Sequence, residues 1–189
     1  SRLELGCHQV VREHVTVNPG TEGGGMLTRI VNNCLLMVGA HVAHDCIVDD
    51  HVILVNNATL GGHVHVGEWG IIGGLSAIHQ FVRVGTHAMI GGMSGVEQDV
   101  IPYGSVTGNR ARLQGLNIVG LKRRSFSRDD IHEMRKAYRL IFAAEGTMAE
   151  RLEDVAEDFG NNEAVMDILQ FIRANTSRAI CQPAMDDAA

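Results

Sequence analysis

Several features that would mark a membrane protein, a disulfide-bonded protein or a serine hydrolase are missing from this sequence. No window approaches the ~18 consecutive apolar residues that a membrane span requires, and the amino terminus lacks the basic-then-apolar pattern of a signal peptide. The four cysteines form no C-x-x-C pair, so reduced thiols are expected. No G-x-S-x-G motif is present. These absences favour a cytoplasmic protein with no transmembrane segment.

The charge is distributed unevenly along the chain. The formal net charge is −6, yet residues 108–139 hold nine Lys or Arg against three acidic residues. A basic window in an acidic chain favours a specific anionic partner over nucleic acid, which usually requires a wholly basic domain. No nucleic acid binding is expected.

A six-residue repeat dominates the first hundred residues. Every sixth residue from Ile30 to Val96 is Ile, Leu or Val, and the residue four positions further on, from Cys34 to Val100, is small or Val. Neither the 3.6-residue period of a helix nor the two-residue period of a strand gives this pattern. It predicts short strands joined by corners, three to an 18-residue coil, with stacked coils forming parallel sheets.

Glycine follows the core aliphatic residue in five repeats, at positions 61, 67, 73, 85 and 91. We expect these glycines to supply the backbone freedom that tight corners need. The register breaks across residues 18–29, where Pro19 to Gly25 predicts a loop that leaves the coil. The chain enters in the middle of a repeat, so further amino-terminal coils are expected in the complete protein.

The pattern changes after Pro102. Residues 1–107 are assigned to a parallel β-helix, and residues 108–181 to a C-terminal helical domain. Capping residues at Ser127, Thr147 and Asn162 precede apolar residues at helical spacing, which predicts three helices. Residues 182–189 show no pattern and are expected to be a disordered tail.

Histidines gather at one predicted corner. Residues 18 apart stack at about 4.8 Å, which places His44, Gly62 and Gln80 in one column, with Asp45 beside the first. His63 and His79 lie one residue off this column. An imidazole beside a carboxylate can act as a general base toward an attacking hydroxyl, so the cluster favours direct attack without a covalent intermediate. The alternative is a solvated polar corner.

Four segments carry a family resemblance: residues 39–46, 56–64, 78–81 and 115–124. They resemble the UDP-N-acetylglucosamine O-acyltransferase family of hexapeptide-repeat enzymes, over essentially the whole chain. The resemblance implies a left-handed β-helix and a homotrimer with sites between subunits. It also implies transfer of a 3-hydroxyacyl group from acyl carrier protein to the 3-hydroxyl of UDP-N-acetylglucosamine, the first step of lipid A biosynthesis. No cofactor is implied beyond the phosphopantetheine of the carrier.

The resemblance also implies site residues. His44 matches the general base, Asp45 its partner, and the Gly62 N–H the oxyanion hole. Nine residues match substrate contacts: His41, His63, His79 and Gln80 with the sugar and pantetheine, Asn117 and Arg124 with the nucleotide, Lys122 and Arg123 with phosphates or the acidic carrier, and Gly92 with the acyl groove. Val119 replaces a family Glu near the nucleotide, and Arg110 replaces a His at the end of the acyl groove.

Three other interpretations remain open. A UDP-sugar N-acyltransferase of the same fold would use a 3-amino acceptor, although the Gly-Leu-Lys-Arg-Arg block at 120–124 argues against it. A γ-carbonic-anhydrase-like enzyme would need three converging zinc ligands, and the odd separation of His41 and His44 would point them to opposite faces of a strand. We therefore expect no metal. A non-catalytic scaffold is the third. The sequence leaves the acyl-chain length open.

Overall fold

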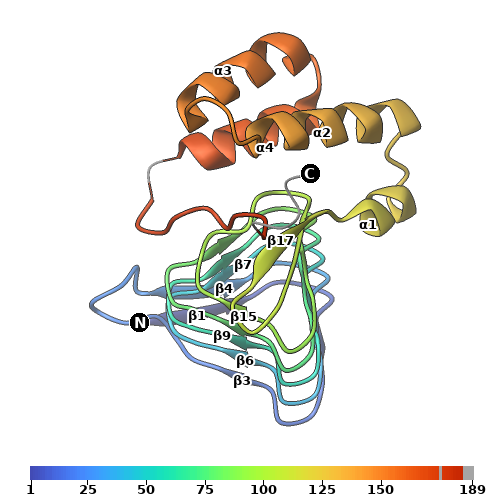
Figure 1. The fold of residues 1–189 in the computed structure, drawn as a ribbon. Helices are drawn as coiled ribbons and strands as arrows, with labels where there is room; N and C mark the ends of the chain where they lie inside the picture. The colour runs from blue at the N-terminus through green and yellow to red at the C-terminus, as the bar shows by residue number, and fades with distance from the viewer. Residues whose placement is uncertain (175, 185–189) are drawn as a thin grey trace.

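The structure is a computed structural model that describes residues 1–174 and 176–184. In this part of the chain, short strands wind into a three-sided coil, and helices gather at one end of it (Figure 1). The loop after the third strand projects sideways from the coil near the N-terminus (Figure 1). No described helix is both long and apolar enough to cross a membrane.

Each side of the coil is one sheet, which we call A, B and C. Sheet A contains β1 (Arg2–Leu5), β4 (Leu27–Ile30), β7 (Ile47–Val48), β10 (His65–Val66) and β13 (Arg83–Val84). Sheet B contains β2 (Val10–Val11), β5 (Leu35–Leu36), β8 (Ile53–Leu54), β11 (Ile71–Ile72), β14 (Met89–Ile90), β16 (Gly104–Thr107) and β17 (Arg112–Leu116). Sheet C contains β3 (Thr16–Val17), β6 (His41–Val42), β9 (Thr59–Leu60), β12 (Ala77–Ile78) and β15 (Gly95–Val96).

The predicted stacking at 18 residues is confirmed. Val48 pairs with Val66, and Val66 pairs with Val84, in parallel register. All twelve aliphatic residues from Ile30 to Val96 are buried, with at most 2% exposure. The small residues of the second inward position, from Cys34 to Val100, are buried as well. The hexad pattern therefore marks the core of the coil.

The expectation that five glycines supply unusual backbone angles is wrong. The left-handed conformation falls two residues after these glycines, on residues such as His63, Trp69 and His87, each with φ near +60°. The glycines are instead needed for space, because a Cβ on Gly61 would lie 2.8 Å from Gln80 N and one on Gly85 would lie 2.3 Å from Pro102 N. Close approach of neighbouring coils, and not φ, explains these glycines.

The boundary between coil and helical region lies later than expected. β17 pairs antiparallel with β16, with a register shift between Ser105 and Val106, and so closes sheet B. The region from residue 108, which was expected to be helical, therefore begins with the second strand of a β-hairpin. At the start of the coil, β4 begins at Leu27, which shortens the expected loop 18–29 to residues 18–26.

The three predicted helices are present, and a fourth precedes them. α2 (Arg128–Ile141), α3 (Met148–Phe159) and α4 (Glu163–Arg173) begin after the N-caps Ser127, Thr147 and Asn162. The capping box at Thr147 and Glu150 is formed as expected. The additional α1 (Ile118–Arg123) has only six residues, too few for an apolar period to reveal it.

After α4 the chain returns to the coil as a strap, residues 176–183. The Asp99 N–H donates to the carbonyl of Ala179, and Leu113 N–H donates to the carbonyl of Gln182. Residues 182–184 of the expected disordered tail are thus ordered against β17, and the remaining part, 185–189, lies outside the described residues.

A buried ion pair joins the strap to the coil. The Asp99 carboxylate is fully buried and accepts from Arg83 Nε at 2.8 Å, from Arg83 N–H at 2.8 Å and from Thr176 Oγ1 at 3.1 Å. Arg83 in turn donates to the carbonyl of Phe171 on α4 and lies 4.0 Å above its ring.

Asp99→Ala should lower the free energy of unfolding by about 3–5 kcal/mol, because the partly buried Arg83 guanidinium loses its buried counterion and Thr176 loses its acceptor. Urea unfolding followed by circular dichroism measures this change. The control is Glu13→Ala, which removes an exposed pair with Arg12 and should leave the free energy of unfolding nearly unchanged because solvent screens this pair. Equal effects of the two substitutions would contradict the prediction.

Candidate active site

The corner between sheets C and A holds His44 and Asp45 between β6 and β7. His44 Nδ1 lies 2.9 Å from Asp45 Oδ2. The Asp45 side chain is 2% exposed, whereas that of His44 is 41% exposed. Asp45 has φ of +58°, a conformation that Asp tolerates better than most residues, and its N–H donates to Thr28 Oγ1 at 2.8 Å. The corner therefore buries the carboxylate and presents the imidazole.

The hydrogen bonds of Asp45 decide the tautomer of His44. The Thr21 hydroxyl and N–H donate to the carboxylate at 2.6 and 3.1 Å. The Thr21 hydroxyl, together with the His44 contact, holds the pKa of Asp45 well below its ordinary value. An ionised carboxylate accepts and cannot donate, so in the neutral imidazole of His44 the proton lies on Nδ1 and the lone pair on Nε2. Nε2 can then accept a proton from a substrate.

Gly62 lies directly against the His44 ring on the next coil. A Cβ on Gly62 would be 2.7 Å from Cε1 and 2.8 Å from Nε2 of His44. Among the described residues, the Gly62 N–H has no hydrogen-bond acceptor, and the same is true of the N–H groups of His44 and Gln80 in this column. Free N–H groups are thus a property of the corner, and that of Gly62 adjoins the candidate base.

His63 completes the cluster. Its ring meets that of His44 edge-on, with centroids 5.1 Å apart, and stacks on Phe81 at 4.4 Å. Ligand atoms of His44, Asp45 and His63 all lie within 4.8 Å of one another, a spacing that a metal ion would also require. Asp45 Oδ2 already accepts from His44 and Thr21.

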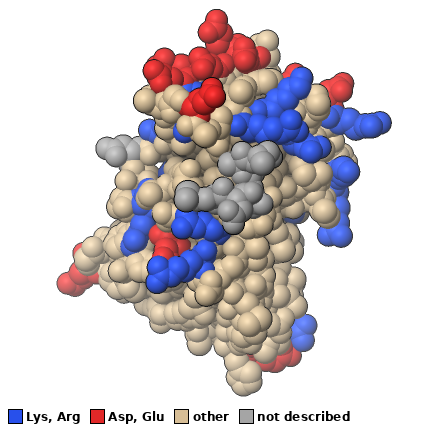
Figure 2. Space-filling model, in the orientation of Figure 1, with Lys and Arg blue, Asp and Glu red and all other residues tan. Residues whose placement is uncertain are grey.

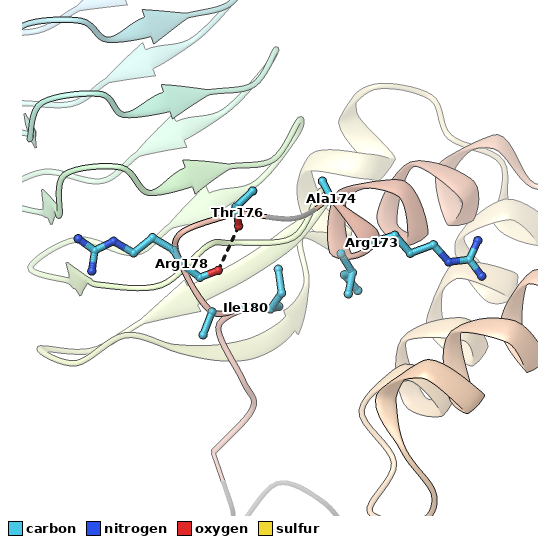
Figure 3. Close-up of a pocket in the computed structure, with 7 residues that line it drawn as sticks. Arg173, Ala174, Thr176, Arg178 and Ile180 are labelled. Atoms are coloured by element: carbon cyan, nitrogen blue, oxygen red, sulfur yellow. Dashed lines mark hydrogen bonds between the residues drawn. The ribbon is translucent and has the colours of Figure 1, made fainter. Parts of the chain in front are cut away.

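The other residues expected near this corner lie on the adjoining side of sheet C. His41 is on β6, with Nδ1 2.7 Å from Thr16 Oγ1. His79 follows β12, and its Nδ1 is 3.2 Å from the carbonyl of Gln80 and 2.8 Å from Nη2 of Arg178 on the strap. A hollow of about 440 Å³ separates the strap from α4, and Arg178 points away from it toward the sheets (Figure 3).

Arg124 and Asn117 occupy a different corner, between sheets A and B. The guanidinium carbon of Arg124 lies 4.6 Å from the ring centroid of Trp69. Asn117 caps α1 by accepting from Gly120 N–H, and its amide donates to the carbonyl of His87. Burial and the nearby Arg124 charge lower the pKa of His87 to about 4, so His87 is neutral near pH 7.

The basic run continues on the surface of the helical region. Lys122 and Arg123 are exposed on α1. Figure 2 shows Lys and Arg gathered over α1 and α2, whereas Asp and Glu gather over α3. Val119, which replaces a family Glu, is 61% exposed beside them. This distribution agrees with the charge asymmetry of the sequence.

Gly92 lies at the third corner, between sheets B and C. It is exposed, and a Cβ there would meet the carbonyl oxygen of Gly74 at 3.3 Å. The expected site residues are therefore spread over all three corners of one chain. His44, Asp45, Gly62 and His63 are brought together at one of these corners, and Asn117 and Arg124 at another.

Four residues that shape these corners were not anticipated. Thr21 and Thr28 form hydrogen bonds with Asp45, Arg178 contacts His79, and the guanidinium of Arg124 lies over the ring of Trp69. Thr21 lies in the loop expected at residues 18–29, but no signal in the sequence singled it out. His79 and Arg178 are 99 positions apart, so no local signal in the sequence predicts their contact.

The fold and the relatives of this chain place it among the acyltransferases of the hexapeptide-repeat class with a left-handed β-helix. A family model described as UDP N-acetylglucosamine O-acyltransferase, domain 2, matches residues 99–181. The acyl-[acyl-carrier-protein]--UDP-N-acetylglucosamine O-acyltransferases of Caulobacter vibrioides and Methylobacterium radiotolerans are 54% and 55% identical to this chain over 97% of its length. The match spans 70% and 67% of those proteins. The chain belongs to this family.

Solved structures agree. The UDP-N-acetylglucosamine acyltransferase from Campylobacter jejuni is 38% identical, with a TM-score of 0.91 over 97% of this chain and 71% of that one. The enzyme from Francisella novicida is 30% identical, with a TM-score of 0.92 over 99% of this chain and 68% of that one.

Gly62→Ala should reduce turnover about 100-fold or more, because the added methyl group displaces the His44 imidazole from its position. Steady-state kinetics with circular dichroism as a check on folding measures this effect. Gly23→Ala is the matched control, since a Cβ there meets nothing within 4 Å. A Gly62 variant as active as the Gly23 variant would show that the close contact is unimportant.

Proposed function

We propose that this protein transfers a 3-hydroxyacyl group from acyl carrier protein to the 3-hydroxyl of UDP-N-acetylglucosamine, the first step of lipid A biosynthesis. The names of its relatives give the acyl carrier protein and the UDP-sugar. The observation that carries the proposal is the 2.9 Å contact between His44 Nδ1 and Asp45 Oδ2, which places the lone pair of the neutral imidazole on Nε2. The cytoplasmic location expected from the sequence is part of the same proposal.

The chemistry is a direct transfer. His44 Nε2 takes the proton of the sugar 3-hydroxyl as its oxygen attacks the thioester carbonyl. The Gly62 N–H donates to the oxygen on which negative charge develops. The carbon–sulfur bond then breaks, and the imidazolium returns its proton to the departing pantetheine thiolate. Burial raises the pKa of Cys46 to about 11, so this neighbouring thiol is protonated at neutral pH and supplies no nucleophile.

The remaining expected contacts follow from their positions. His41, His63, His79 and Gln80 adjoin the base along the same side and are assigned to the sugar and pantetheine. Arg124 and Asn117 are assigned to the nucleotide. Arg124 Nε is buried with no partner among the described residues, so a donor is available there. Lys122 and Arg123 are assigned to phosphates or to the acidic carrier.

A homotrimer follows from the same proposal. His44 and Arg124 lie at opposite ends of sheet A, and Gly92 lies at the far end of sheet C from His44. One substrate cannot reach all three corners of one chain. A neighbouring copy that presents its own Arg124 and Gly92 corners beside His44 would complete the site, as closed rotational symmetry allows.

His44→Ala should lower turnover about 10²–10⁴-fold with an intact fold, because the general base is lost and the residue packs against no core. Turnover of UDP-N-acetylglucosamine with 3-hydroxyacyl carrier protein is the measurement, with size exclusion as the control for assembly. Dialysis against a chelator tests the metal alternative. A His44 variant near parental turnover would overturn the base assignment, and loss of parental activity on chelation would favour a metal enzyme.

Arg124→Ala should raise the Michaelis constant for the UDP-sugar about 10- to 100-fold, because a charged hydrogen bond contributes about 1.5–3 kcal/mol.

Co-expression of His44→Ala and Arg124→Ala chains then tests the intersubunit site. With random mixing, about a quarter of the sites would pair an intact His44 with an intact Arg124 from the neighbour. No recovery in mixed assemblies would place both residues in one chain's site.

A further inference from the structure

The loop that leaves the coil folds back onto the catalytic pair. Thr21 donates its hydroxyl to Asp45 Oδ2 at 2.6 Å and its N–H to both carboxylate oxygens at 3.1 Å. Gly24, three residues on, lies so close that a Cβ there would be 2.3 Å from Asp45 Cγ. The loop therefore both bonds the carboxylate and covers it, which accounts for its 2% exposure.

The loop itself is held rigidly at this place. Gly20 is buried, its N–H donates to the carbonyl of Arg2 at 3.0 Å, and a Cβ there would meet Leu27 N at 2.0 Å. The Gly24 N–H closes a turn on the carbonyl of Thr21 at 3.1 Å. Backbone contacts hold the loop in place, so the fold of the loop does not need the Thr21 hydroxyl, which can donate to Asp45.

We propose that Thr21 is a positioning residue for the reaction, which acts through Asp45 to fix the orientation of the His44 imidazole. This inference rests on the proposed role of His44 as general base. Asp45 Oδ2 receives the Thr21 hydroxyl and His44 Nδ1 together. The hydroxyl thereby fixes the rotation of the carboxylate, and the carboxylate fixes the plane of the imidazole and the direction of Nε2.

The hydroxyl also moderates the charge that Asp45 presents to His44. Thr21 is the largest cause of the lowered pKa of Asp45. Without this bond, more of the carboxylate charge is directed at the imidazole, which stabilises its protonated and inactive form. The other titratable groups beside the pair include His63, from the next coil, and the Cys46 thiol, which is protonated at neutral pH. Loss of the hydroxyl should therefore move the acid limb of the pH–rate profile to higher pH.

Thr21→Val is the direct test, because valine has the same shape and lacks the hydroxyl. We expect kcat to fall about tenfold or more from misorientation of the base, with the Michaelis constants unchanged and the acid limb shifted upward. Thr21→Ser restores the hydroxyl donor, so most of the parental kcat and most of the parental position of the acid limb should return. Glu22→Gln changes an exposed neighbour in the same loop and should behave as the parent, which controls for general disturbance of the loop.

The outcomes separate this inference from the proposed function. If His44→Ala is inactive and Thr21→Val has parental kcat and pH profile, Thr21 has no positioning role and the base assignment stands. If Thr21→Val and Thr21→Ser lose activity equally with no change in the profile, the residue is structural and the inference is overturned. If His44→Ala is active, the base assignment itself fails.

Discussion

The stacking of one aliphatic side chain on another at every eighteenth residue is the constraint on which the rest of the molecule depends. Each hexad from Ile30 to Val96 buries one large and one small residue, and the coil stays in register as long as these columns are filled. The outward side chains at a corner then stack as regularly as the core does. His44, Gly62 and Gln80 share a column because Val42, Leu60 and Ile78 share one.

Because the corner residues stack in the same register as the core, much of the molecule could be predicted from the sequence. The hexad positions and the three N-caps are local or strictly periodic signals, and both predictions are confirmed. The grouping of Asp45 and Gly62 around His44 follows from the same period. The members of a column can be predicted without knowledge of distant contacts, because the 18-residue register alone places them next to one another.

What could not be predicted depends on contacts outside the period. Thr21 reaches Asp45 from a loop with no register, and Arg178 reaches His79 across 99 residues. The role of the corner glycines was predicted wrongly for a different reason. The sequence shows only that a glycine is present, and a need for space and a need for a left-handed backbone select the same residue. At Gly61 the neighbouring coil, and not φ, is decisive.

The repeat also explains why a corner hosts the chemistry. Strand residues use their N–H groups to bind the next coil, whereas His44, Gly62 and Gln80 at the corner have N–H groups with no acceptor among the described residues. The fold thus provides donors for an oxyanion before any special residue is added. A corner is also convex, however, so it cannot enclose a substrate, and His44 remains 41% exposed. A second surface must close the site, which is the physical reason for expecting a neighbouring copy of the chain beside this corner.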